Sequence, residues 1–319
     1  MFKFNFALGD GDEMASAAPT FEAVTTTAAA AGDEEIPVNT ANPEISPSGV
    51  AAAEIVDERE AGGLQAAICD EDLLELGEVR LLRPVFSTEL FTLGVEEHSY
   101  DADTERERSV ALAAAVNESR DVLPGVYEGG FKLWECSVDL LHYLHDAVVP
   151  LAGKKVAEYG CGMGMPGLFA LLSGASHVHL QDYNKEVLLY LTIPAVKSNV
   201  AAQAEAGKEV TGTVEYMAGD WTLVQENLEE REQQYDVILT TDTLYCTTAH
   251  AALCSLIKAT LAPGGAAYVA AKSYYFGVGG SVYEFQELAT REGFDVTRVK
   301  TIGDKKSNVR EIIKLVARA

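Results

Sequence analysis

Apolar and polar positions fall into regular blocks from Leu123 onward, and these blocks predict strands and helices in turn. Short apolar runs that stop at glycine or polar residues are typical of strands, and the segments between them are long enough for helices. Strands that alternate with helices indicate an α/β fold with a doubly wound, mostly parallel sheet. Strands are expected at 153–160, 176–183, 214–221, 235–245 and 266–275, and helices at 166–174, 185–206 (with a break at Pro194), 247–261 and 281–293.

The chain ends on two apolar runs, 294–304 and 309–318, with only a short polar turn between them. Because no helix separates these runs, they must pair as an antiparallel hairpin at one edge of the sheet. A plain dinucleotide-binding fold is all parallel, whereas a reversed last strand is typical of nucleoside-binding methyltransferase domains. The pattern therefore predicts a seven-stranded, Rossmann-like methyltransferase sheet with an antiparallel last strand, in a domain over residues 123–319.

The first part of the chain lacks this regularity. Residues 1–78 combine Ala, Thr, Ser, Pro and acidic residues without apolar periodicity, which predicts a disordered acidic tail. One short helical turn is expected at 69–78. Residues 79–122 are interpreted as an N-terminal extension that packs on the core, with a strand or two at 78–91 and a helix at 103–121.

Composition narrows the class of protein. The chain has 319 residues, of which 48% are hydrophobic and 23% charged, as is typical of a globular protein with a full core. Its formal charge of −25, from 49 acidic and 24 basic residues, argues against tight non-specific binding to a phosphate backbone, so no direct nucleic-acid partner is expected. The sequence shows neither the roughly 18 consecutive apolar residues of a membrane span nor a secretory signal, so no membrane partner is expected.

Cysteine and histidine positions predict no disulfide framework and no metal site. Five Cys without a C-x-x-C pair fit a reducing compartment, so cytoplasm or nucleus is the expected location. The six His show no metal-binding spacing. Nothing in the sequence demands more than a monomer.

A glycine-rich turn follows the first predicted strand and opens the first helix. Glu158 is followed by Gly160, Gly162 and Gly164, which allow a sharp turn and a close approach of a ligand to the backbone. The residue three after Gly162 is Met165, so the dinucleotide fingerprint G-x-G-x-x-G is absent. The acid-x-G-x-G-x-G form is the one that cradles the methionine part of S-adenosylmethionine, and Glu158 lies where it could meet the ammonium group. The alternative is a tight strand-to-helix turn without a ligand.

Acidic and aromatic residues end the next two strands. Asp182, 22 residues after Gly160, could accept hydrogen bonds from both ribose hydroxyls of an adenine nucleoside, or it could be a solvated acid or a helix cap. After Gly219, Asp220 could accept from the adenine amino group, and Trp221 could pack on the ring or belong to the core. These groups stand at the carboxyl ends of successive strands, where open parallel sheets bind ligands.

Five blocks resemble the histidine protein methyltransferases, and the resemblance covers roughly residues 120–319. It implies S-adenosylmethionine-dependent methylation of a histidine ring nitrogen, in the cytosol and nucleus, with the basic large-subunit ribosomal protein uL3 as the substrate. A wider family of protein lysine methyltransferases shares the fold and an acid-x-x-Tyr motif, here Asp242 to Tyr245. The five blocks are EGGFKLWECSVDLL (128–141), EYGCGMG (158–164), LQDYNKEVL (180–188), ILTTDTLY (238–245) and AAKSYYFGVGGSVYEF (270–285).

The resemblance also implies a set of cofactor positions. The chain departs from the family at Met163, where a small hydroxyl residue is common, at Asp242, where Glu is common, and at Thr241, which replaces Ser. The implied positions are Leu133, Trp134, Glu135, Cys136, Ser137, Gly160, Gln181, Asp182, Tyr183, Gly219, Asp220, Trp221 and Thr241.

The resemblance and the chemistry of methyl transfer together suggest two catalytic residues. A neutral imidazole is nucleophilic at pH 7, because its unperturbed pKa is about 6.5, whereas a lysine must first lose a proton at a pKa of about 10.4. Our hypothesis is that Asp242 accepts a hydrogen bond from the non-reacting ring N–H and that Tyr245 lines the acceptor slot. Gly277, Gly279 and Gly280 would let a loop close over the target peptide. Alternatively, Asp242 caps the helix near Thr247 and Tyr245 is a core residue.

Two other functions stay open on the sequence alone. One is a protein lysine methyltransferase of the same fold. The other is a catalytically silent cofactor-fold protein whose acidic tail binds a basic partner.

Overall fold

A mixed eight-stranded sheet forms the centre of the part of the chain that the computed structural model describes, which is residues 53–63, 68–97, 103–303 and 308–318. The order is β1-β6-β5-β4-β7-β8-β10-β9, and the five strands from β6 to β8 are mutually parallel. Hence the carboxyl ends of these five strands meet at one edge. The bounds are β1 Glu54–Val56, β4 Lys155–Tyr159, β5 His177–Asp182, β6 Thr213–Ala218, β7 Tyr235–Thr241, β8 Leu261–Lys272, β9 Phe294–Ile302 and β10 Arg310–Ala317.

Both ends of the sheet are antiparallel. The last strand, β10, pairs antiparallel with β8 and with β9, which confirms the predicted hairpin and the reversed last strand. At the other edge β1 pairs antiparallel with β6 and adds an eighth strand. Lys185 holds β1 and the segment after it by ion pairs with Glu54 and Glu60, at 3.2 and 2.9 Å.

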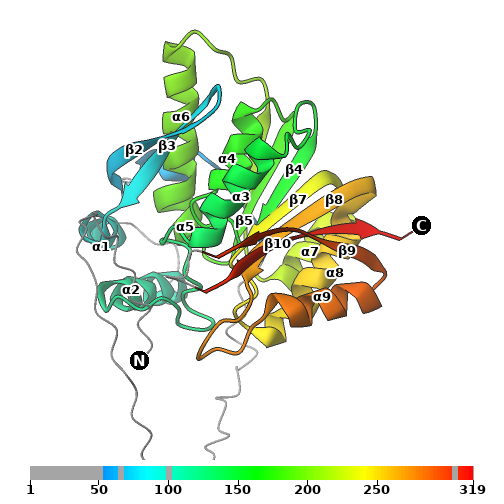
Figure 1. The fold of residues 1–319 in the computed structure, drawn as a ribbon. Helices are drawn as coiled ribbons and strands as arrows, with labels where there is room; N and C mark the ends of the chain where they lie inside the picture. The colour runs from blue at the N-terminus through cyan, green and yellow to red at the C-terminus, as the bar shows by residue number, and fades with distance from the viewer. Residues whose placement is uncertain (1–52, 64–67, 98–102, 304–307, 319) are drawn as a thin grey trace, which may run out of the picture.

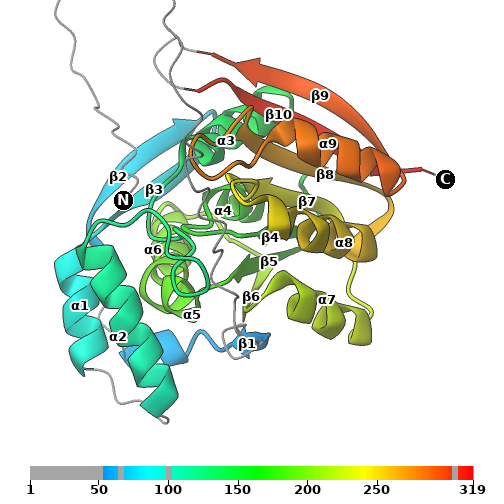
Figure 2. The ribbon, with the colours of Figure 1, turned by 90° about the horizontal axis from the view of Figure 1, so that it is seen from below.

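Helices cover both faces of the sheet (Figures 1 and 2). Neighbouring strand residues such as Val237 and Ile238 point to opposite faces, so each strand contributes to two separate hydrophobic cores. One core contains α3 Glu135–Asp146, α4 Met165–Leu172 and α6 Ile193–Glu205, and the other contains α7 Trp221–Glu230, α8 His250–Thr260 and α9 Val282–Arg291. The layers are those of a Rossmann-like methyltransferase sheet, as predicted.

The predicted helix 185–206 has an irregular centre. It consists of α5 Lys185–Val187, a wider π-helical turn at Leu188–Thr192 and then α6. The irregular turn ends just before Pro194, which lacks the N–H that a continuous α-helix would use. The predicted kink or break at Pro194 is therefore found as this π-helical turn, and the helix continues through Pro194 in α6.

Two parts of the sequence-based description are wrong around β6 and β8. The strand predicted to reach residue 221 stops at Ala218, and the unpredicted helix α7 begins at Trp221 after Asp220 caps it. The strand β8 starts at Leu261 rather than 266, because the chain passes from α8 (preceded by the short turn η4 Thr247–Ala249) directly into extended backbone.

The N-terminal part is more ordered than predicted. Residues 69–78 were expected to form a helical turn within a disordered tail, but β2 Ile68–Leu76 pairs antiparallel with β3 Val79–Phe86. Gly77, with a φ of +59°, supplies the tight turn between them. Together with β1 and the short turn η2 Glu60–Gly63, these strands show that the tail does not extend to residue 78. The prediction for residues 1–52 lies outside the described residues.

The extension packs on α6 and then leads to the edge where the strands end. The side chain of Asn199 accepts from the Leu82 N–H at 2.8 Å and donates to the Leu82 carbonyl at 2.9 Å, which fixes β3 against α6. Helices α1 Thr88–Glu97 and α2 Asp103–Asn117 follow and lie side by side (Figure 2).

Candidate active site at the carboxyl edge of the sheet

The glycine turn between β4 and α4 requires glycine for its backbone conformation. Gly160, Gly162 and Gly164 have φ values of +64°, +50° and +69°, a region that side chains disfavour. A Cβ on Gly160 would lie 2.6 Å from the Thr243 methyl group, and one on Gly162 would lie 3.0 Å from the Gly130 carbonyl. The turn is thus packed closely between the chain segments that follow β7 and precede α3.

Glu158 lies behind this turn and keeps one oxygen without a partner. Its Oε2 accepts the Gly167 N–H in the first turn of α4 at 2.7 Å, while the fully buried Oε1 makes no hydrogen bond. Burial raises the pKa of Glu158 to about 8, although the Gly167 N–H opposes the shift and the charge of Asp182 adds to it. A donor or cation near Oε1 would stabilise the ionised form.

Asp182 ends β5 and binds the turn from the other side. Its two carboxylate oxygens accept from the backbone N–H groups of Gly162, at 2.9 Å, and Asn184, at 3.0 Å. Burial raises the pKa of Asp182 to about 6, because desolvation outweighs those two hydrogen bonds. Glu158 and Asp182 therefore make a buried, electronegative region at the glycine turn that suits a cationic ligand.

Gln181 joins three of the predicted cofactor segments. Its Oε1 accepts from the Gly160 N–H at 3.1 Å and from the Trp221 indole at 3.0 Å, and its Nε2 donates to the Gly219 carbonyl at 2.9 Å. The fully buried Gln181 thereby sets the position of half-buried Trp221. Asp220 accepts the Thr222 N–H at 2.8 Å and caps α7.

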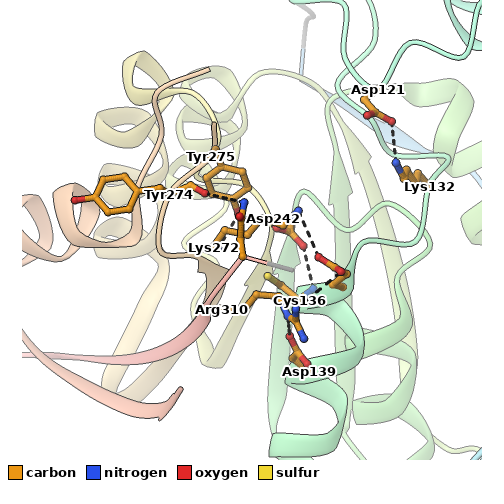
Figure 3. A network of polar contacts seen from close by, with 11 residues as sticks. Asp121, Lys132, Cys136, Asp139, Asp242, Lys272, Tyr274, Tyr275 and Arg310 are labelled. Atoms are coloured by element: carbon orange, nitrogen blue, oxygen red, sulfur yellow. Dashed lines mark hydrogen bonds and ion pairs between the residues drawn. The ribbon is translucent and has the colours of Figure 1, made fainter. Parts of the chain in front are cut away.

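The start of α3 is tied to Asp242, the residue after β7 (Figure 3). Asp242 Oδ2 accepts the Cys136 N–H at 3.0 Å, and Oδ1 accepts the Tyr275 hydroxyl at 2.8 Å. Asp242 holds a φ of +54°, which is unusual for a residue with a side chain and is found where surrounding contacts fix it. The helix that Asp242 binds is α3 and not the one near Thr247, so that alternative from the sequence is wrong.

A cavity of about 550 Å³ opens beside Asp242 at the carboxyl edge. Tyr245 and Glu128 line it, and the Tyr245 hydroxyl donates to Glu128 Oε2. Burial, together with the charge of Glu128, raises the pKa of Tyr245 well above its ordinary value, so the phenol stays a donor. The other lining residues are Glu118, Ser119, Arg120, Asp121, Val122, Pro124, Trp134, Asp242, Lys272, Tyr275 and Val278.

The sequence analysis did not predict Lys272 and Tyr275 as site residues. Lys272 is nearly buried (3% exposed), and its Nζ lies 3.5 Å from Glu135 Oε2 and 5.5 Å from the centre of the Trp134 ring. Burial, reinforced by the charge of Asp242, raises the pKa of the Tyr275 phenol well above its ordinary value. The signal that was available was the Lys-Ser-Tyr-Tyr run at the end of a predicted strand, the same position in the fold as Asp182.

The remaining predicted residues surround the glycine turn and the cavity. The Trp134 indole donates to the Gly129 carbonyl at 3.0 Å, and the Tyr183 hydroxyl donates to the Gly125 carbonyl at 3.3 Å. Gly280 packs so closely on the chain after β7 that a Cβ would lie 1.8 Å from the Leu244 carbonyl oxygen. Leu133 is half-buried, and Ser137 and Thr241 are buried at the start of α3 and the end of β7.

The described residues also bear on metal binding and on membrane spans. No group of His, Cys, Asp and Glu side chains there is arranged to hold a metal ion. Within the same ranges, no helix is both long and apolar enough to cross a membrane.

The mostly parallel sheet with its reversed last strand, together with the glycine turn after β4, identifies the fold as Rossmann-like and of the methyltransferase type. Residues 125–276 match a family described as lysine methyltransferase. The chain is similar to the histidine protein methyltransferases, which confirms the resemblance on which the sequence analysis relied.

Similarity to two of these relatives is extensive. A histidine protein methyltransferase 1 homolog of Dictyostelium discoideum is 44% identical over 199 residues, which cover 62% of this chain and 61% of the relative. The Rattus norvegicus homolog is 37% identical, over 61% of this chain and 58% of the relative. The chain thus spans about three fifths of the curated relatives it matches. Among solved structures, magnesium protoporphyrin IX methyltransferase from Synechocystis shares 12% identity over 72% of this chain and 90% of its own, with a TM-score of 0.42.

Proposed function

We propose that this protein is an S-adenosylmethionine-dependent protein-histidine N-methyltransferase. The observation that carries the proposal is the convergence of four strand ends on one edge. There Asp182 binds the glycine turn, Gln181 links that turn to Trp221, and Asp242 borders an open cavity. The names of the two relatives above support histidine as the acceptor, and the family described as lysine methyltransferase makes lysine the alternative.

The residues at the glycine turn fit this cofactor. Buried Glu158 Oε1 has no partner, and an ammonium group or an intervening water would supply one. Asp182 would receive the ribose hydroxyls, and the Trp221 ring, fixed by Gln181, would pack on the adenine. When bound, S-adenosylmethionine supplies an electrophilic methyl group on a positively charged sulfur.

The chain's own part in the reaction is alignment and charge. The cavity side chains orient a neutral imidazole so that its nitrogen faces the methyl group, and such positioning can supply about 7–11 kcal/mol of the barrier reduction. Asp242 fixes the start of α3, which carries Trp134 to Ser137, against the cavity wall. Carboxylates on the wall stabilise the positive charge that moves onto the ring as the new bond forms.

The substrate that we propose is the large-subunit ribosomal protein uL3, with a cytosolic and nuclear location and a monomeric enzyme. The family resemblance supports uL3, and the formal charge of −25 favours a basic protein partner through long-range attraction.

The test is methyl transfer from labelled S-adenosylmethionine to purified uL3 and, separately, to ribosomal extract. After acid hydrolysis, labelled methylhistidine is the expected product. Methyllysine would replace the proposal by the lysine alternative. Absence of label in both, together with calorimetric binding of the cofactor, would favour a silent binding protein, and absence of binding would remove the cofactor assignment.

A further inference from the structure

We propose that Glu128 is the residue that accepts the non-reacting ring N–H of the target histidine and stabilises the charge formed during transfer. This inference rests on the proposed function and assigns a role that the sequence-based hypothesis gave to Asp242. It follows from the different partners of the carboxylates that border the cavity.

Four of the described cavity residues carry a carboxylate, and three of these are committed elsewhere. Glu118 forms an ion pair with Arg120 at 2.7 Å, and Asp121 forms one with Lys132 at 2.9 Å. Asp242 is nearly buried (7% exposed), and it faces the positive end of the α3 dipole through the Cys136 N–H. Two of the three negative charges are therefore paired with cations, and the third is stabilised by the start of a helix.

Glu128 differs from Glu118 and Asp121 because its side-chain hydrogen bonds come from neutral donors. It differs from Asp242 because it is half-buried and accepts from no helix terminus. Oε1 accepts the Gly125 N–H at 2.8 Å, and Oε2 accepts the Tyr245 hydroxyl. Among the described residues no cation lies within ion-pair distance of it. A half-buried carboxylate without a compensating cation is the cavity group best suited to a developing positive charge.

The position of Glu128 is fixed on both sides. Its own N–H donates to Asn184 Oδ1 at 3.1 Å, and the Asn184 amide donates to the Val126 carbonyl at 2.7 Å. Asn184 follows Tyr183 at the end of β5, so the segment that carries Glu128 is anchored beside the proposed nucleoside site. Preorganised groups of this kind need no rearrangement during the reaction.

The charge balance of the step is simple. The ring nitrogen's lone pair forms the new N–C bond, and the electron pair of the broken bond stays on the departing sulfur. The positive charge passes to the ring, whose remaining N–H points at Glu128. That proton is then released through Glu128 to solvent, which leaves a neutral methylhistidine.

The experiment compares Glu128→Gln with the wild-type protein on a histidine-containing uL3 substrate. Glutamine keeps the size but lacks the charge. Its one carbonyl oxygen can accept the Gly125 N–H, while its NH2 group can donate to the Tyr245 hydroxyl instead of accepting from it. We expect kcat to fall by about tenfold to a hundredfold, with calorimetric cofactor affinity unchanged. Glu230→Gln, at the far end of α7, is the matched control and should keep wild-type kcat.

The pH profile separates a catalytic role from a structural one. A neighbouring carboxylate raises the pKa of the bound imidazole, which must be neutral to react. Removing that charge should lower the pKa of the bound imidazole and so shift the acid limb of the kcat profile to lower pH. The acid limb of the kcat/KM profile reports the free substrate and should stay in place. Tyr245→Phe, which keeps the Glu128 charge, should lower kcat only a few-fold and leave the profile unshifted.

Wild-type kcat together with an unshifted profile in Glu128→Gln would overturn this inference while leaving the proposed function intact. If Glu128→Gln does not fold, Glu128→Asp provides the test, because it withdraws the carboxylate by one methylene. Wild-type kcat in Glu128→Asp would equally overturn this inference. If the wild-type protein methylates no histidine, the proposed function fails first, and this inference fails with it.

Discussion

Individual buried carboxylates give this site its chemical character. Glu158, Asp182 and Asp242 all lie within or directly after a strand, yet each is used differently by its surroundings. Glu158 has a free oxygen, Asp182 is held by two backbone N–H groups, and Asp242 joins α3 to Tyr275. Because their partners differ, we expect these three carboxylates to respond differently to substitution.

Asp242→Asn should reduce methyl transfer by disturbing the start of α3. Asparagine can accept the Cys136 N–H, but the charge at the helix N-terminus is lost, a contribution of about 0.3–1 kcal/mol or more when buried. We expect weaker cofactor binding by calorimetry together with lower kcat. Tyr275→Phe is the partial control, because it removes only the Oδ1 contact. Unchanged turnover and unchanged cofactor affinity in Asp242→Asn would end this assignment.

Glu158 should make the protein less stable as the pH rises. Because its pKa is raised from the usual 4.5 to about 8 in the folded state, the folded state binds more protons than the unfolded state between these values. The free energy of unfolding therefore decreases as the pH rises through this window. Glu158→Gln should remove this dependence and raise Tm at pH 8.5 by about 2–4 °C for each kcal/mol of penalty relieved. A steeper loss of Tm in the variant would contradict the assignment.

At the scale of elements, helix starts do most of the positioning. The first turns of α3, α4 and α7 each receive a carboxylate, from Asp242, Glu158 and Asp220 respectively. Because these helices begin where the parallel strands end, their exposed N–H groups all lie at the edge that holds the site. Capping and ligand binding therefore compete for the same acidic side chains.

Asp220 allows these two roles to be separated. Asp220→Ala should cost about 0.5–2 kcal/mol of stability, because it removes the cap of α7. Asp220→Ser restores a cap but is too short to reach an adenine amino group. We expect thermal melts to show wild-type stability for the serine variant and calorimetry to show about tenfold weaker cofactor binding. Wild-type binding by Asp220→Ser would leave Asp220 as a cap only.

For the whole molecule, the arrangement of negative charge is the property with the widest consequence. The net charge is −25, and two buried carboxyl groups at the glycine turn have pKa values raised to about 6 and about 8. A cationic ligand would offset the desolvation that raises the pKa values of both carboxyl groups. Ligand binding, folding stability and pH are therefore linked through one edge of the sheet.

This linkage predicts a pH-dependent thermal shift. S-adenosylmethionine in hundredfold excess over its dissociation constant should stabilise the protein by about 2.7 kcal/mol. At a fixed ligand concentration the rise in Tm should be larger at pH 8 than at pH 6, since Asp182 and Glu158 ionise across this interval. S-adenosylhomocysteine keeps the ammonium group proposed to face Glu158, so Glu158→Gln is the control and should show a weaker pH dependence. Equal shifts at both pH values would contradict the electrostatic account.

The sequence by itself determined the order of the core elements, the antiparallel ending and the glycine turn. Apolar periodicity and glycine spacing are local properties, so they can be recognised without knowing which segments meet. The helix α7 was missed, although Asp220 directly before it is a local capping signal, because the strand was extended past Gly219 to Trp221. The edge strand β1 was missed as well, because three residues that pair with β6 carry no periodicity of their own.

Only the tertiary structure decided which acids meet which partners. Cys136 and Asp242 are 106 positions apart, and Glu128 and Tyr245 are 117 apart, so neither pair leaves a mark in the local sequence. The cavity wall at 118–122 likewise comes from a segment that sequence patterning placed in an extension. The physical reason is that a side chain's charge, exposure and hydrogen-bond partners depend on long-range packing, whereas backbone conformation depends largely on its neighbours in the chain.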